Sequence, residues 1–294
     1  MRSSHPMHVH LYQLTEEKSL PHLAMLLGQL VNQPLKDRIC QIGYQEFRLD
    51  EAIQPDRHWP VWRISICKFR SEGPGRAKRN TPSQGINLDE DEDFTEDTAI
   101  LFNPASKMMV MQYNHYGPRA GSIIDYFNAW TGNNSAVYTL APKLNPNVQA
   151  RLQSKQQFTR VAFKVAPSKI TDEWKRNNVA LTTMLEDQAN LWEGEWITVV
   201  VSLDARDPQA TLSVRNKLRS LIGLSHESRD AVKILKISGR DQAGLRVDPI
   251  DLLAERLERT YNGLPLESRR IALSDRWKAL HDAYERWRID GIIR

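Results

Sequence analysis

The sequence predicts an α+β fold with two globular domains, each combining mixed or antiparallel sheets with packed helices. Two observations carry this expectation: strand-like segments dominate the first half, and strands and helices alternate in the second half without long βαβ regularity. A chain of 294 residues is also long enough for two ordinary domains. The weakest link between the halves lies at residues 142–157, so we expect domains at 1–155 and 156–294.

The first half contains short segments rich in β-branched and aromatic residues. Strands are expected at 9–14, 38–49 and 61–70, with a helix at 19–31. Residues 98–102 and 107–114 flank an Asn-Pro-Ala-Ser turn and predict a hairpin. A helix is expected at 122–130, a strand at 137–140, and a short helix that starts at Asn145-Pro146, with Asn145 as N-cap. The alternation of residues 158–166 predicts another strand.

The second half mixes the two kinds of element. Helices are expected at 182–192, 207–222, 248–261 and 274–288, a buried strand at 196–203 and a further strand at 232–238. In the last helix, apolar residues recur every three or four positions and form one stripe. The stripe consists of Trp277, Leu280, Tyr284 and Trp287.

Composition excludes several classes of protein. A hydrophobic content of 40% can bury a core and argues against global disorder. The apolar run 197–203 is too short to cross a bilayer, and the polar, His-rich start is unlike a signal peptide. Cys40 and Cys67 lie in strand-like segments without metal-ligand spacing. We therefore expect a cytoplasmic protein without a disulfide scaffold.

Positive charge is concentrated in one part of the chain. The whole chain carries a formal net charge of +4, whereas residues 205–247 contain nine basic and four acidic residues. Several cations held on rigid elements can bind phosphates, although a solvated basic surface has the same composition. Six cations in this stretch are candidate DNA contacts: Arg215 and Arg219 on one helix face, and Lys233, Lys236, Arg240 and Arg246 on a strand and the turn after it.

Other charged segments are weaker candidates. The Gly-Pro loop 71–82 carries cations that fit a second phosphate contact or a soluble loop. The acidic run 89–93 lacks the spacing of a calcium-binding loop. The histidines near the start of the sequence, His5, His8 and His10, are weak evidence for a metal-binding tract. We expect neither a metal nor another cofactor.

Catalytic motifs are absent from the sequence. It has no Gly-x-Ser-x-Gly elbow, P-loop, Gly-x-Gly-x-x-Gly or His-Glu-x-x-His motif. Asp204 is a lone candidate for a metal-dependent nuclease. The polar, aromatic segment 113–118 follows a strand, where it fits either a site or a strand-to-helix turn.

Several segments together resemble RexA-like phage-exclusion proteins and their bacterial relatives in defence loci. Residues 98–103 (Thr-Ala-Ile-Leu-Phe-Asn), 111–118 (Met-Gln-Tyr-Asn-His-Tyr-Gly-Pro) and 123–127 (Ile-Ile-Asp-Tyr-Phe) are similar to the family's central hairpin and helix. Residues 137–144 and 158–165 are similar to the next strand pair. Residues 230–244 and 252–253 are similar to the C-terminal strand, turn and helix. The resemblance covers roughly residues 98–290.

The resemblance implies a homodimeric, two-domain protein that binds double-stranded DNA without sequence preference and has no known catalytic site. In the family, basic residues of the C-terminal strand and turn contact DNA, which corresponds here to Lys236, Ser238 and Arg240. Ser238 is uncharged where the family example has a basic residue, and the neighbouring Lys233 and Lys236 are expected to substitute for it. One family member works with a membrane partner, which implies a separate effector protein here.

These observations lead to one functional hypothesis and two alternatives. The hypothesis is a non-enzymatic, sequence-nonspecific DNA-binding protein of an anti-phage system that senses DNA or phage nucleoprotein and signals to an effector. One alternative is a metal-dependent nuclease that uses Asp204 and the acidic run. The other is a protein-interaction module whose basic face meets an acidic partner.

Overall fold

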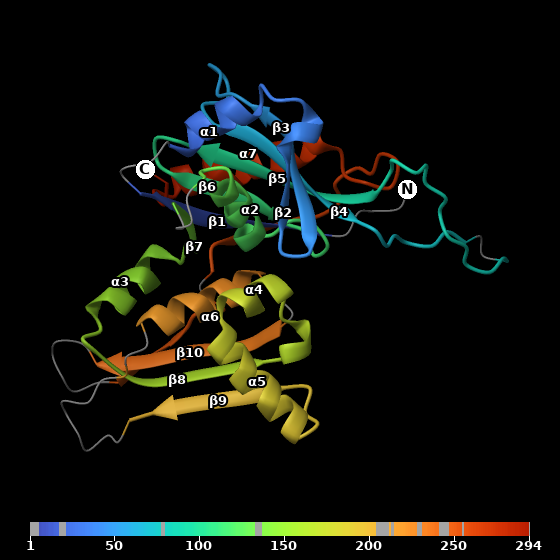
Figure 1. Cartoon of the computed structure of the whole chain (residues 1–294). Coiled ribbons are helices and arrows are strands. Elements are labelled where there is room, and N and C mark those ends of the chain that lie inside the picture. The colour runs from blue at the N-terminus through green and yellow to red at the C-terminus, as the bar shows by residue number, and fades with distance from the viewer. Residues whose placement is uncertain are drawn as a thin grey trace. The chain divides into compact units, whose positions relative to one another are not determined.

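The computed structural model describes residues 6–17, 22–77, 80–132, 137–203, 212, 215–227, 231–240, 247–254 and 256–293. The chain forms two compact units. Unit 1 comprises Met1–Val9, Leu14–Leu140 and Arg259–Arg294, and unit 2 comprises His10–Gln13 and Ala141–Glu258. Helices and antiparallel sheets occur in both, which confirms the α+β class (Figure 1).

The first sheet has the strand order β12-β1-β6-β5-β4-β3-β2, and β7 also pairs with β1. Its strands are β1 (Met7–Glu16), β2 (Ile39–Ile42), β3 (Gln45–Ile53), β4 (Trp62–Arg70), β5 (Phe94–Asn103), β6 (Met108–Tyr113), β7 (Tyr138–Pro142) and β12 (Glu258–Tyr261). The predicted hairpin at 98–114 is confirmed, since β5 and β6 pair antiparallel. The single strand expected at 38–49 is instead a hairpin, because Gly43 turns the chain with a positive φ of 64°.

Unit 1 also contains α1 (Leu23–Leu30), the 3-10 turn η1 (Leu35–Arg38), α2 (Ala120–Ala129) and α7 (Leu273–Ile289). The start of the helix expected at 19–31 falls partly on residues 18–21, outside the described residues. The apolar stripe of the last helix is confirmed, because Trp277, Leu280, Tyr284 and Trp287 are all buried. The Trp277 indole N–H also donates to the carbonyl of Ile64, 3.2 Å away.

The last helix explains why the two units differ from the domains expected at 1–155 and 156–294. Helix α7 packs on β5 and β6 of the first sheet, so the C-terminal segment belongs with the first half of the chain. Apart from His10–Gln13, the chain enters unit 2 at Ala141 and leaves it after Glu258. The contacts that decide this are long-range and have no local signature in the sequence.

Unit 2 is built on a four-stranded antiparallel sheet with the order β11-β10-β8-β9 (Figure 1). The strands are β8 (Gln157–Val165), β9 (Ile197–Ser202), β10 (Val232–Arg240) and β11 (Val247–Asp251). The helices are α3 (Pro146–Ser154), α4 (Asp172–Asn177), α5 (Val179–Leu191) and α6 (Arg215–Glu227), with a 3-10 turn η2 (Pro167–Lys169). The predicted N-cap is confirmed, since the Asn145 side chain accepts from the Asn147 N–H.

Two expectations for the second half are wrong. The helix expected at 248–261 is replaced by β11 and β12, and Pro249 lies on an edge strand, where a residue without an N–H is tolerated. The strand expected at 196–203 exists as β9, but it is an edge strand and not a buried one. Val200 and Val201 are 49% and 44% exposed.

Candidate nucleic-acid interface

The second sheet has one apolar face and one polar face. Val161, Phe163 and Val165 of β8 and Leu235 and Ile237 of β10 are buried in one hydrophobic cluster. Helices α3, α4, α5 and α6 contribute Val148, Trp174, Leu185 and Leu218 to the same cluster. Because side chains alternate along a strand, the intervening residues point away from these helices.

Three cations project from that second face. The register places Lys236 opposite Ala162, with Arg160 and Lys164 two residues to either side of Ala162 on β8. Side chains of paired residues share a face, and diagonal neighbours lie about 7–8 Å apart. On β9, Arg160 pairs with Ser202 and Lys164 with Thr198, and the exposed Val200 lies between these two, opposite Ala162. The three charges therefore lie close together on a shallow surface.

At one end of this face, three lysines lie near the ring of one tryptophan. A bulge in β10 between Val232 and Ile234 displaces Lys233, whose Nζ lies 3.9 Å from the centroid of the Trp196 ring. Lys169 Nζ lies 5.1 Å and Lys164 Nζ 6.0 Å from the same centroid. Cations at these distances are attracted to the indole π-system. We call Arg160, Lys164, Lys169, Lys233 and Lys236, with Trp196, the basic sheet face.

Two carboxylates contact the basic sheet face. Glu195 Oε1 lies 2.9 Å from Lys169 Nζ, and Asp251 Oδ2 lies 3.5 Å from Lys236 Nζ. The hydrogen bond from Lys169, with the charges of Lys169 and Lys233, holds the pKa of Glu195 below its usual value. Five cations against two anions leave an excess of three positive charges on the face. Exposed ion pairs of this kind are weak, but each carboxylate competes with an incoming phosphate for its lysine.

The structure brings together only part of the predicted DNA-binding set. Lys233 and Lys236 both lie on the basic sheet face, and Arg240 is half-buried at the end of β10. Arg215 and Arg219 belong to α6, which packs on the opposite, apolar face of the sheet through Leu218, Leu221 and Leu224. Arg246 lies outside the described residues. The side chains of Arg215 and Arg219 also lie outside the described residues, so their predicted contact with DNA stays a prediction.

Sequence reasoning missed Arg160, Lys164, Lys169 and Trp196. The alternation of the 158–166 strand placed Arg160 and Lys164 on a shared face opposite Val161 and Phe163, and this signal was readable. Their proximity to Lys236 was not readable, because it depends on the antiparallel pairing of β8 with β10. The bulge in β10 brings Lys233 near the Trp196 ring, and no local sequence pattern predicts that bulge.

The other candidates from the sequence form no comparable cluster. Asp204, His5, Lys78 and Arg79 lie outside the described residues. Within the described part of the chain, no group of three or more His, Cys, Asp and Glu side chains is arranged to hold a metal ion. Cys40 and Cys67 are free thiols on β2 and β4. In the same part, no helix has the length and apolar character needed to span a membrane.

Residues 13–286 match the model of a family described as a family of unknown function, DUF6731. The chain belongs to the DUF6731 family. The DUF6731 match spans every residue of the basic sheet face and most of both units. No curated protein matches the sequence. The description of DUF6731 names no activity.

Proposed function

We propose that this protein binds duplex DNA without sequence preference, through the basic sheet face of unit 2. The observation that carries the proposal is the register of β8 with β10, which clusters Arg160, Lys164 and Lys236 on the sheet face that the helices of unit 2 leave open. Phosphates are bound by such cations with release of counterions, which makes binding favourable at low salt. Lys233 extends the cluster toward Trp196.

The chemistry of the face favours contacts to the DNA backbone over reading of bases. Lysine and arginine side chains on a shallow surface reach phosphate oxygens, and such contacts carry no sequence information by themselves. Thr198 and Ser202 lie beside Lys164 and Arg160 on the edge strand β9 and can add hydrogen bonds to phosphates. The described helices of unit 2 pack on the other face of the sheet, so the face itself presents no helix to a DNA groove.

The biological setting rests on the RexA-like resemblance. It supports a role in phage exclusion or a related defence, a homodimer, and a separate effector protein. A dimer would double the cationic surface and add avidity. The free thiols Cys40 and Cys67 support a reducing, cytoplasmic location.

The proposal is tested by fluorescence anisotropy with a random-sequence duplex at about 50 and 200 mM salt. We expect binding that weakens steeply with salt. The double variant Arg160→Gln/Lys164→Gln should bind more weakly at low salt and should lose about two-thirds of the salt slope. The matched control is Lys36→Gln/Arg57→Gln, which removes the same charge from exposed positions of unit 1. The control should retain the wild-type slope.

Two results would replace the proposal with an alternative. Absence of duplex binding at the lower salt concentration would favour a protein-interaction module with an acidic partner. Cleavage of plasmid with Mg²⁺ or Mn²⁺ that disappears in Asp204→Ala would favour the nuclease. An equal loss of binding in the control variant would show that net charge, and not the basic sheet face, is responsible.

A further inference from the structure

Unit 1 contains a cavity of about 720 Å³ that the proposed DNA contact does not use. Its walls come from β5, the segment 112–116 that ends β6, the segment 266–271 and Arg276 of α7. This volume is within the ordinary range of small-molecule sites, about 300–1,000 Å³. The polar, aromatic segment 113–118, which the sequence left open between a site and a turn, supplies one side of the wall.

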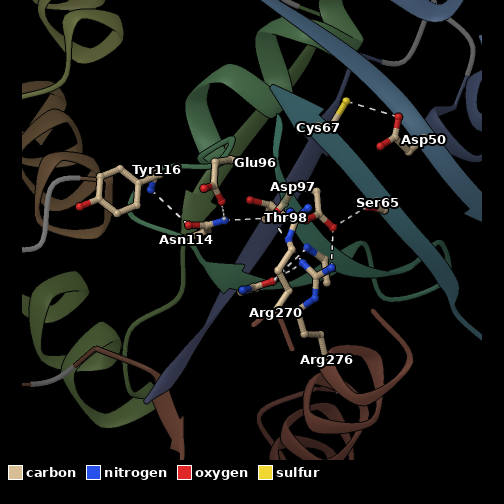
Figure 2. A network of polar contacts seen from close by, with 12 residues as sticks. Asp50, Ser65, Cys67, Glu96, Asp97, Thr98, Asn114, Tyr116, Arg270 and Arg276 are labelled. Atoms are coloured by element: carbon tan, nitrogen blue, oxygen red, sulfur yellow. Dashed lines mark hydrogen bonds and ion pairs between the residues drawn. The ribbon is translucent and has the colours of Figure 1, made fainter. Parts of the chain in front are cut away.

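Two arginines share one carboxylate in this wall. Asp97 Oδ2 lies 2.5 Å from Arg276 Nη2, and Asp97 Oδ1 lies 2.6 Å from Arg270 Nη2, as Figure 2 shows. The Ser65 hydroxyl donates to Asp97 Oδ2 at 3.3 Å. Arg276 is only 7% exposed, and its buried Nε has no partner among the described residues. Because one negative charge faces two positive ones, the wall keeps uncompensated positive charge.

The segment before α7 adds a further cation in a strained turn. Glu267 and Arg270 exchange two backbone hydrogen bonds of 2.8 Å, so Ser268 and Arg269 form the two-residue tip. Both have positive φ values, 47° and 69°, although neither is glycine. Such backbone strain concentrates at binding sites. Arg269 is exposed, lines the cavity, and forms no ion pair with a described residue.

Another part of the cavity wall offers aromatic rings on a loop that hydrogen bonds hold in place. Tyr116 is 58% exposed, with the Arg70 guanidinium 5.6 Å from its ring centroid and the His115 ring against its edge. Asn114 Oδ1 accepts from the Tyr116 N–H, and Asn114 Nδ2 donates to the carbonyl of Asp97 at 2.9 Å (Figure 2). Gly117 is required beside it, since a Cβ there would lie 2.6 Å from Asn114 Nδ2.

The lining as a whole favours an anion with a flat ring. Four arginines and two carboxylates line the cavity, namely Arg70, Arg269, Arg270 and Arg276 with Glu96 and Asp97. The apolar part of the wall includes Phe94, Pro74 and Leu266. Arginine is suited to phosphate oxygens through its fork of N–H donors, and aromatic and guanidinium faces stack on planar rings.

We infer that this cavity binds a nucleoside phosphate, with the phosphates on Arg269 and Arg270 and the base beside Tyr116. The inference concerns unit 1 and is independent of the basic sheet face in unit 2. An inorganic anion would use only the arginines, and a nucleoside without phosphate would use only the aromatic side. The combined ligand uses both, which is the chemical basis for choosing this class.

Isothermal titration calorimetry with ADP, adenosine and inorganic phosphate tests the assignment on the full chain. We expect ADP to bind more tightly than either fragment. Arg269→Gln should weaken ADP binding at least about tenfold, as expected for loss of one charge-assisted hydrogen bond. Tyr116→Ala should weaken ADP but leave phosphate binding unchanged. In the wild-type protein, ADP should also protect Arg269 from modification by phenylglyoxal, read by mass spectrometry.

Control variants separate this site from the DNA-binding proposal. Arg57→Gln, an exposed arginine of unit 1 outside the cavity, should leave ADP affinity unchanged. Lys164→Gln should weaken DNA and leave ADP unchanged. Absence of ADP binding, ADP binding that Arg269→Gln does not alter, or phosphate binding as tight as ADP would each overturn the assignment. So would an ADP affinity lost equally in Arg57→Gln or Lys164→Gln.

Discussion

Replacing Asp251 by asparagine should strengthen DNA binding, which unfolding or a general loss of structure cannot do. Asp251 Oδ2 lies 3.5 Å from Lys236 Nζ, while Oδ1 accepts from the N–H groups of Leu253 and Ala254. Asparagine keeps an oxygen for those two N–H groups and removes the charge that competes with DNA for Lys236. The turn after β11 is therefore retained in the variant.

The magnitude follows from the number of cations that are free to bind phosphate. In the described part of unit 2, Arg160, Lys164 and Lys233 of the basic sheet face form no ion pair with a carboxylate, whereas Lys236 does. Three phosphate contacts give a slope of log K against log salt of about −2.7, and four give about −3.6. Raising the salt fourfold should therefore cost the wild type about 40-fold in affinity and Asp251→Asn about 150-fold.

The measurement is a salt titration of anisotropy with a random duplex. Asp290→Asn is the matched control, because Asp290 is also an exposed carboxylate paired with a single arginine, Arg259, at 3.3 Å. The variant Asp251→Asn should bind more tightly than wild type at low salt, with the steeper slope, and the control should match wild type. A wild-type slope in Asp251→Asn would refute the role given to Lys236.

Three further predictions concern unit 1. Asp97→Asn removes the one carboxylate that two arginines share. The variant should have a free energy of unfolding lower by about 3 kcal/mol, measured as a fall in Tm. The control Asp290→Asn should lower it by less than about 1 kcal/mol. Arg269→Gly relieves the positive φ of 69°, so it should raise the free energy of unfolding by about 1 kcal/mol in denaturant titrations while it weakens ADP binding. An unchanged free energy of unfolding would contradict the backbone strain at Arg269. Burial by itself would raise the pKa of Glu16, but hydrogen bonds from Lys107, the Leu23 N–H and His22 lower this pKa below its usual value. The carboxylate therefore stabilises the fold above the unfolded pKa and ceases to do so as pH falls through the folded pKa. Glu16→Gln should lower the free energy of unfolding by about 2 kcal/mol at neutral pH and by progressively less below about pH 4.5. A difference in unfolding free energy between wild type and variant that does not change with pH would refute this.

Local patterns in the sequence were sufficient for many elements. The stripe of α7 is periodic at helical spacing, and the Asn145-Pro146 start of α3 has the residues that a helix N-terminus needs. Hairpin β5–β6 follows from two strand-like runs around a short turn. The helix predicted at 248–261 was wrong, because Asp-Pro fits both a helix start and an edge strand. Only the pairing with β10 decides between the two.

The sequence by itself determined the α+β class, most helices and strands, and the presence of a positively charged stretch that includes Lys233 and Lys236. Those properties depend on residues close together in the chain, whose periodicity and charge can be read directly. The tertiary structure alone decided that Arg160 and Lys164 join Lys236 on one surface, that α6 lies on the other side of the sheet, and that Asp97 meets Arg270 and Arg276. Each of these depends on pairing and packing between residues distant in the sequence, where a shift of one residue in register would exchange the faces.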